Sequence, residues 1–331
     1  EFRRVLFRSG SLIPGVLLRA TTFPGPAWPH LLRFWSRRIL RIVPALYLAL
    51  IVAFLAGDPD VRRHPAWHFG LASNVLIWRD NHWLSSTSHL WSLGAEVQFY
   101  VLWPLLIFGV ARSRLRGVLW ACVAAGPVYR LVVLILRGGV AAPYVLPMSV
   151  LDPFAVGALL ALPGAPLRTS VLLPLAAIAA ALTTFARWPE APAIVTSAAT
   201  TGSLLFAWLA AGLVGQAITG FNGLAGRMLD SRPLRYLGTI SYGIYLWHLF
   251  MPFLAFAMFQ AFGGHLSGYA AERAVWVALT LVASAVSWHL VEEPLSRLKP
   301  ALTGGSPTAP AATSIGSELL RRNRQGNQQL T

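Results

Sequence analysis

The sequence predicts an all-α, polytopic bundle of transmembrane helices, and three observations carry this prediction. Of the 331 residues, 56% are hydrophobic and only 12% are charged, against roughly 25% charged residues in an ordinary soluble domain. Apolar runs recur along the chain at about the 17–25 residues that a helix needs to cross the hydrocarbon core. The runs are continuous, whereas the strands of a transmembrane barrel are alternating segments of about ten residues.

Eight apolar runs have the length of spans, and a short apolar piece at 10–18 has the character of part of a ninth. The segment 66–78 is too short to cross and is expected to lie at the interface or to re-enter the membrane. From 301 to 331 the chain is rich in Gly, Pro, Ser and Gln, which predicts a disordered cytoplasmic tail. The eight predicted spans are residues 40–57, 90–110, 117–137, 144–163, 170–187, 193–216, 234–258 and 274–292.

The basic residues are distributed unevenly between the two sides of this bundle. One side collects 20 of the 27 Lys and Arg residues, the other side six, and Arg130 falls inside a span. By the positive-inside rule the rich side is cytoplasmic, and so is the C-terminus. The net charge of +15 is also seen in nucleic-acid-binding proteins. Here, however, the arginines flank apolar runs, so the expected partner is membrane lipid and not nucleic acid.

Two further compositional features bear on the source and on the chemistry. One lysine among 27 basic residues, with abundant Ala, Arg, Gly and Pro, indicates a GC-rich bacterial genome. The expected location is therefore the bacterial cytoplasmic (inner) membrane, as a multi-pass protein. Cys122 is the single cysteine, so no intrachain disulfide or cysteine-based metal site is expected.

The first nine residues have a non-native character. The stretch Arg4–Ser9 back-translates to the end of a common sequencing adapter, so residues 1–9 are expected to be foreign and the native sequence to begin near Gly10. The alternative is a native basic N-terminal arm.

Ionisable residues inside predicted spans are costly and usually mark function. Glu96 stands in such a span, after Trp91 and before Tyr100, and is expected either to line a polar cavity or to pair with an arginine between helices. Three arginines, Arg37, Arg38 and Arg41, stand at the cytoplasmic mouth of another span. Arg37 and Arg41 share a helical face; the cluster is suited either to phosphates or to anionic lipid head groups.

A third polar group follows a helical stripe. Ser241, Tyr245 and His248 are spaced three or four residues apart in an apolar segment. His248 has the chemistry of a general acid or base, or of a structural hydrogen bond between helices.

Three acidic residues stand near span ends. Asp152 opens one span and is expected near an interface, where its charge costs little. Glu292 and Glu293 close the last span, where the helix dipole disfavours a negative charge. For both glutamates a structural ion pair with Arg297 is expected.

Together these stretches resemble the acyltransferase-3 family of bacterial integral-membrane acyltransferases. Four motifs occur in the family's order: an arginine motif ending in Arg-Ile-x-Pro at 41–44, Trp-Ser-Leu-x-x-Glu-x-Gln-Phe-Tyr at 91–100, Ile-Ser-Tyr-x-x-Tyr-Leu-Trp-His at 240–248, and Glu-x-Pro at 292–294. The resemblance runs from about Gly10 to Lys299, which makes residues 10–300 one membrane acyltransferase domain.

The resemblance implies transfer of an acyl group, often acetyl, from an acyl-CoA on the cytoplasmic side to a hydroxyl of a carbohydrate or other cell-envelope molecule. It implies acyl-CoA as donor substrate, and neither a metal nor a bound cofactor. Arg37, Arg38 and Arg41 would hold the donor, and Glu96 and His248 are the candidate catalytic residues. The other matched motif positions are Trp91, Ser92, Tyr100, Asp152, Ser241, Tyr242, Tyr245 and Glu292.

The chain departs from the family pattern in two places. The family's catalytic histidine lies in its first membrane helix, in an Arg/Lys-x10-His pattern that none of the eight histidines here matches. Eight or nine of roughly ten expected spans, each of about 20 residues, are thus predicted, and the fragment is expected to be inactive by itself. The family's arginine beside Asp152 is replaced by apolar residues. The alternative function is a transporter or flippase of a lipid-linked saccharide.

Overall fold

The computed structural model describes residues 28–138, 141–162, 221, 223–261 and 269–302. Within these ranges the chain forms helices and their connections, without a β-strand, so the predicted all-α class is confirmed. Four helices in the described part are long and apolar enough to cross a membrane, and a bent pair adds a fifth if it counts as one span. They are α3 (Trp28–Leu55), α7 (Leu90–Gly109), α8 (Arg112–Arg137), the run Ala270–Leu298, and the pair α14 (Ser241–Trp247) with α15 (Phe250–Ala261).

Three predicted spans differ from the helices that form. The span predicted at 40–57 begins at Trp28, because the helix continues through the arginines that lower the hydropathy of its first turns. The span predicted at 144–163 is replaced by the 3-10 turn η1 (Pro147–Val150) and the short helix α9 (Leu151–Ala161), which together are too short to count as a span. The span predicted at 234–258 is divided into α13 (Arg232–Thr239), α14 and α15, with a 60° bend between the last two.

Several predictions lie outside the described residues. These are the foreign segment 1–9, the apolar piece 10–18, the spans 170–187 and 193–216, and the tail except for its first two residues. The count of eight or nine spans therefore stays a prediction.

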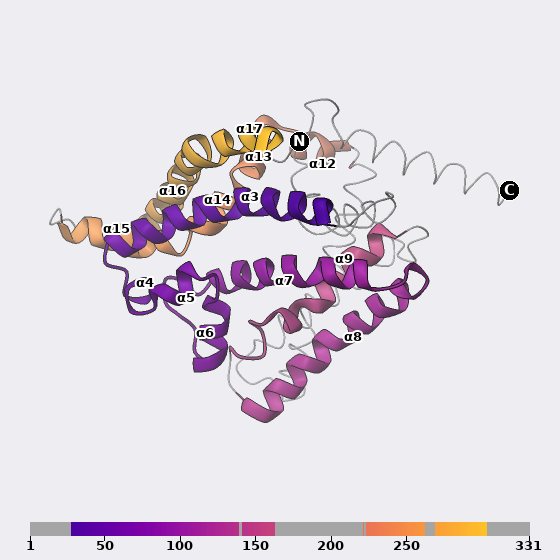
Figure 1. Cartoon of the computed structure of the whole chain (residues 1–331). Helices are drawn as coiled ribbons and strands as arrows, with labels where there is room; N and C mark the ends of the chain where they lie inside the picture. Colours follow the sequence, from indigo (N-terminus) through magenta and orange to yellow (C-terminus); the bar gives the residue numbers. More distant parts are fainter. Residues whose placement is uncertain (1–27, 139–140, 163–220, 222, 262–268, 303–331) are drawn as a thin grey trace.

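Helices α3 and α7 run side by side through the middle of the molecule (Figure 1). α14 and α16 (Tyr269–Ser287) contact each other, and α3 contacts α14 and α17 (Glu293–Leu302). On the far side of α7, helix α8 packs against α9. Three apolar cores result among the described residues: one around Trp103 and Leu119, one around Leu50 and Phe250, and a smaller one around Ile77 and Val145.

The outer face of α8 shows why this bundle needs a membrane. Val128, Ile135 and Leu136 are between 59% and 77% exposed. A soluble helix would turn such side chains toward a core, and lipid is the solvent that suits them here.

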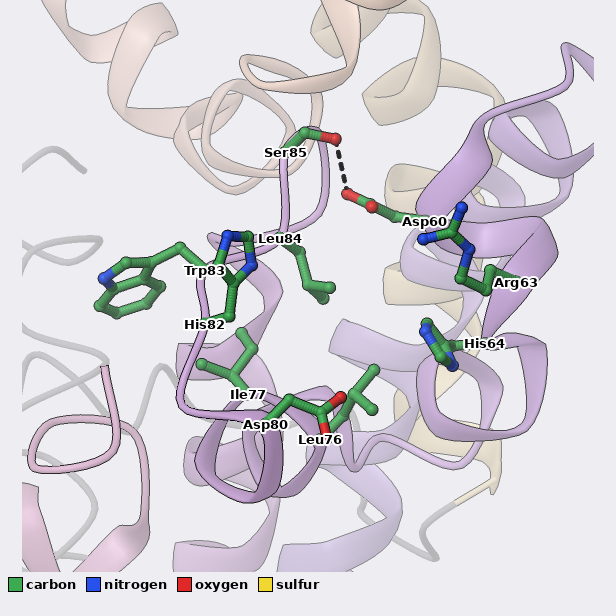
Figure 2. A pocket seen from close by; sticks show the side chains of 10 residues that line it. All are labelled: Asp60, Arg63, His64, Leu76, Ile77, Asp80, His82, Trp83, Leu84 and Ser85. Carbon is green, nitrogen blue, oxygen red and sulfur yellow. Dashed lines mark hydrogen bonds between the residues drawn. The ribbon is translucent and has the colours of Figure 1, made fainter. Parts of the chain in front are cut away.

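Short helices fill the connection between α3 and α7. α4 (Pro59–Arg63), α5 (Pro65–Phe69) and α6 (Ser73–Asp80) occupy the region that was predicted not to span, and that negative prediction is confirmed. Asp58 caps α4, since its Oδ1 accepts hydrogen bonds from the N–H groups of Asp60 and Val61. With the loop 82–85, α4 and α6 line a cavity of about 450 Å³ (Figure 2). The remaining described helix is α12 (Gly223–Leu229).

Candidate active site

A polar stripe runs along α7 and its N-cap residue. His89, Ser92, Glu96 and Tyr100 are spaced three, four and four residues apart, which places them on one helical face. This face is directed toward α3 and α14, as the contacts of its members show. The sequence indicated Ser92, Glu96 and Tyr100 as motif positions, and the structure adds His89.

At one end of the stripe, a hydrogen bond joins α3 to a carbonyl of α7 that a proline leaves free of its helical partner. Pro104 has no N–H, so the carbonyl of Tyr100, four residues earlier, is left without its helical partner. The indole Nε1 of Trp35 donates a hydrogen bond of 2.8 Å to this carbonyl. The guanidinium of Arg38 lies over the ring of Tyr100, 5.2 Å from the centroid, and over Phe34 at 5.5 Å.

Acidic and phenolic groups gather around this arginine. The hydroxyl of Tyr100 donates to the carboxylate of Glu96, and Arg38 lies within electrostatic reach of Glu96 and Arg41. From α14, the hydroxyl of Tyr242 donates to the carbonyl of Ile42 at 2.8 Å. We call this group the arginine cluster; its members are Arg38, Arg41, Glu96, Tyr100, Tyr242 and Glu292.

Glu292 joins the cluster through a widened helical turn. The π-helical segment η2 (Trp288–Glu292) ends two residues before Pro294. Such a turn relieves the clash between a proline ring and the preceding carbonyls, and is frequent at functional sites. Glu292 is buried, accepts a hydrogen bond from Ser287 at 3.3 Å, and is an electrostatic neighbour of Tyr242.

The expected ion pair with Arg297 forms for Glu293. Arg297 bonds to Glu293 at 2.8 Å, and His289 contacts the same carboxylate at 3.0 Å. Arg297 is four residues after Glu293 and therefore shares its helical face. For Glu292 the pairing with Arg297 stays a prediction.

Of the three predicted donor-binding arginines, the structure brings two into the cluster. Arg37 is exposed, whereas Arg38 and Arg41 are partly buried and lie near Glu96 and Tyr242. The sequence paired Arg37 with Arg41 on one face; the inward pair is Arg38 with Arg41, three residues apart.

A pair of histidines occupies the other end of the stripe. Nε2 of His89 contacts the carbonyl of Leu246 at 2.9 Å, and Nδ1 of His248 contacts the carbonyl of Tyr245 at 2.6 Å. A carbonyl only accepts, so these two nitrogens carry the ring protons. In the neutral rings, the lone pairs are on Nδ1 of His89 and Nε2 of His248. The two ring centroids are 4.9 Å apart.

The two rings differ in their surroundings. His248 is exposed, whereas His89 is 7% exposed, and its Nδ1 has no hydrogen-bond partner among the described residues. Burial lowers the pKa of His89 to about 4, and the neighbouring His248 and His68 act in the same direction. His89 is therefore neutral at pH 7 and presents a buried acceptor nitrogen.

Tyr245 forms hydrogen bonds beside the histidine pair, whereas two other predicted positions, Ser241 and Trp91, have other contacts. The hydroxyl of Tyr245 donates to the carbonyl of His89 at 2.6 Å and lies 2.5 Å from the hydroxyl of Ser92. Ser241 is exposed, and its hydroxyl donates to the carbonyl of Gly238, three residues earlier in the chain. The ring of Trp91 contacts that of Trp83.

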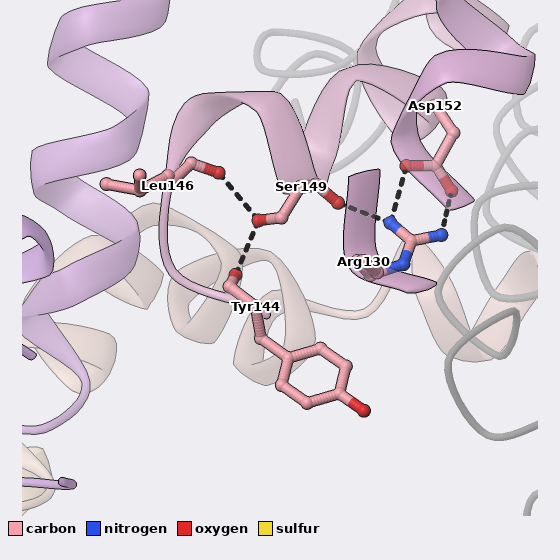
Figure 3. Close-up of polar contacts among 5 residues, drawn as sticks. All are labelled: Arg130, Tyr144, Leu146, Ser149 and Asp152. Carbon is pink, nitrogen blue, oxygen red and sulfur yellow. Dashed lines mark hydrogen bonds and ion pairs between the residues drawn. The ribbon is translucent and has the colours of Figure 1, made fainter. Parts of the chain in front are cut away.

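Asp152 corrects another expectation. Its carboxylate is fully buried and forms two hydrogen bonds with Arg130, of 2.9 and 3.0 Å (Figure 3). The same guanidinium donates to the carbonyl of Ser149. Gly126 provides the space, since a Cβ there would lie 2.4 Å from Asp152 Oδ1. The charge of Asp152 is therefore compensated by a buried arginine, which comes from α8 and not from its sequence neighbours.

The described residues contain no group of three or more His, Cys, Asp or Glu side chains arranged to hold a metal ion. Two residues of these sites, His89 and Arg130, were not among the predicted site positions. The spacing of His89 from Ser92 and Glu96 was a usable signal for the first. For Arg130, the signal was its position inside an apolar span.

Comparisons with known proteins agree with the motif resemblance. A family model for the acyltransferase-3 domain, described as an acyltransferase domain, matches residues 9–292. The chain is 27% identical over 327 residues to a candidate peptidoglycan O-acetyltransferase of Bacillus subtilis, YrhL, covering 87% of this chain and 49% of that protein.

Two further relatives are O-acetyltransferases by name. The peptidoglycan O-acetyltransferase OatA of Listeria monocytogenes is 24% identical (87% of this chain, 50% of that protein). The O-acetyltransferase OatA of Staphylococcus aureus is 22% identical (81% and 48%). The chain spans about half the length of these relatives. No solved structure matches. Because the family match includes both ends of the polar stripe and four apolar spanning helices, the chain is a membrane protein of the acyltransferase-3 family.

Proposed function

We propose that this chain is the membrane part of an O-acetyltransferase that moves an acetyl group from acetyl-CoA to a hydroxyl of an envelope glycan such as peptidoglycan. The observation that carries the proposal is the convergence of motif residues from α3, α7, α14 and η2 on one polar stripe. The transporter or flippase alternative is not favoured, because the family match and the named relatives are acyl-transfer proteins.

The arginine cluster supports binding of the donor's phosphates. Arg38 and Arg41 supply two guanidinium groups, which bind phosphate through charge-assisted, bidentate hydrogen bonds. Their acidic neighbours Glu96 and Glu292 balance the charge when the site is empty. We assign Glu96 to positioning Arg38 and not to the chemical step, since its carboxylate is engaged by Tyr100.

The distance between the arginine cluster and the histidine pair suits a long donor that has phosphates at one end and a thioester at the other. Glu96 and His89 are seven residues apart on α7, which is about 10 Å at 1.5 Å per residue. Phosphates held at the arginine cluster therefore leave the flexible arm of the donor to extend along the stripe toward the histidines.

His248 is the proposed general base. Its Nδ1–H is held by the Tyr245 carbonyl, so Nε2 of the exposed ring can accept a proton. Nε2 takes the proton of the acceptor hydroxyl, the oxygen forms a bond with the acyl carbon, and the carbon–sulfur bond breaks. The thiolate leaves with the proton returned from His248. The arginine end is the cytoplasmic one by the charge distribution of the sequence.

Acetyl-CoA binding to the chain in lipid nanodiscs tests the donor site. Arg38→Ala is expected to weaken binding about 10- to 100-fold, because a hydrogen bond to a charged group contributes about 1.5–3 kcal/mol. Arg33→Ala, an exposed arginine on the same helix, is the control and should bind normally. Arg37→Ala should resemble the control. Unchanged binding by a folded Arg38→Ala protein would mean that the arginines only contact lipid head groups.

A further inference from the structure

The cavity between α4, α6 and the loop 82–85 is used neither by the arginine cluster nor by the histidine pair. It has a volume of about 450 Å³, within the roughly 300–1,000 Å³ of small-molecule sites. Figure 2 shows side chains of opposite character around it. The polar ones are Asp60, Arg63, His64, Asp80, His82 and Ser85, and the apolar ones are Leu76, Ile77, Trp83 and Leu84.

One carboxylate holds the loop across this cavity. Oδ2 of Asp60 accepts hydrogen bonds from the hydroxyl of Ser85 at 2.9 Å, from the N–H of Ser86 at 3.0 Å, and from the hydroxyls of Ser86 and Thr87 at 3.3 Å. Burial opposes ionisation of Asp60, but these bonds outweigh it and lower its pKa. The wall is therefore preformed and carries a charged carboxylate. All four of these bonds reach Oδ2.

The cavity lies at the histidine end of the site. Thr87, which bonds to Asp60, is two residues before His89. The buried His68 is an electrostatic neighbour of both Asp60 and His89. The arginine cluster lies toward the opposite end of α3, since 14 residues separate Arg41 from the helix end at Leu55, or about 20 Å.

The lining selects among chemical classes of ligand. A purely apolar ligand would cover polar side chains such as Arg63, His64 and His82 without offering them hydrogen bonds. An anion would meet two carboxylates, of which Asp80 is already paired with Arg79. A neutral ring that carries hydroxyl and amide groups can use the carboxylate, guanidinium and imidazole groups, while its C–H face lies against Trp83 and Leu84.

We propose that this cavity binds a sugar ring of the acceptor glycan and delivers its hydroxyl to the histidine end of the stripe. The proposal rests on the O-acetyltransferase function proposed above. Donor and acceptor then enter at opposite ends of α3, and they meet beside His248 and His89.

The test uses chitotetraose, a chain of four N-acetylglucosamine units, as the probe for the full chain in nanodiscs. Saturable binding is followed by ligand-observed NMR. Arg63→Gln and Trp83→Leu should each weaken binding about two- to tenfold, which corresponds to one net hydrogen bond or a similar contact. Arg62→Gln is the matched control, because Arg62 is the neighbouring exposed arginine of α4 and bonds to Phe54 outside the cavity.

Acetyl-CoA affinity is measured on the same samples and separates the two proposals. Loss of sugar binding in Arg63→Gln and Trp83→Leu with unchanged acetyl-CoA affinity supports the cavity assignment. No saturable sugar binding, or binding that neither variant changes, overturns it and leaves the donor site standing. Sugar binding that depends on the cavity, in a chain whose Arg38→Ala variant binds acetyl-CoA normally, overturns the proposed donor site and keeps the sugar site.

Discussion

Mild acid should destabilise this protein through His89. Burial lowers the pKa of His89 from 6.5 to about 4 in the folded chain. Above pH 6.5 the ring is neutral in both states and has no effect on the free energy of unfolding. Between 6.5 and 4 only the unfolded chain takes up the proton, so stability falls as the pH falls. The loss is about 1 kcal/mol at pH 5.5 and about 2–3 kcal/mol at pH 4.5.

The assay is the free energy of unfolding in mixed micelles at pH 7.5 and pH 5.5. His89→Gln is the informative variant, because its side-chain amide can still donate to the Leu246 carbonyl but has no group that titrates in this range. The variant should lose about 1 kcal/mol less than the wild type between the two pH values. His68, whose pKa is also lowered by burial, contributes equally to both proteins and cancels.

His82→Gln serves as the control for this experiment, since His82 is exposed. Its pH dependence should equal that of the wild type. If wild type and His89→Gln lose the same stability on acidification, then His89 is not held neutral by burial, and the account of the histidine pair fails.

Three further predictions follow from the described contacts. Asp152→Leu should cost about 3–5 kcal/mol of stability because it leaves Arg130 buried without its carboxylate, and adding Arg130→Leu should recover most of it. His248→Gln should abolish acetyl transfer to glycan in membranes without changing acetyl-CoA affinity. Reporter fusions should place residue 116 in the cytoplasm and residue 260 outside.

Each has an outcome that contradicts it. Equal stability of Asp152→Leu and wild type would mean that the buried pair is not formed. Transfer that survives His248→Gln would assign the base to another residue. An external reporter after Arg116 would reverse the topology and place the arginine end on the wrong side for acyl-CoA.

Local sequence patterns were enough for the class of protein and for part of the site. The hydropathy of a single helix decides whether it partitions into lipid, so the membrane-helix character, the length of α7 and the end of α8 followed from it. Helical spacing likewise placed Ser92, Glu96 and Tyr100 on one face. Arg38 and His248 were singled out as polar residues at or inside apolar runs, and Tyr242 by motif resemblance. The structure brings all three to the stripe.

What only the tertiary structure decided is which residues meet across helices. Leu246, which fixes the tautomer of His89, is 157 positions away in the chain, and Arg130 reaches Asp152 only because α8 packs on α9 over Gly126. Composition shows that a buried charge needs a partner, but the partner is chosen by the rotation and packing of whole helices. A shift of one residue on a helix turns a side chain by about 100°, which is why Arg38 and not Arg37 faces Tyr100.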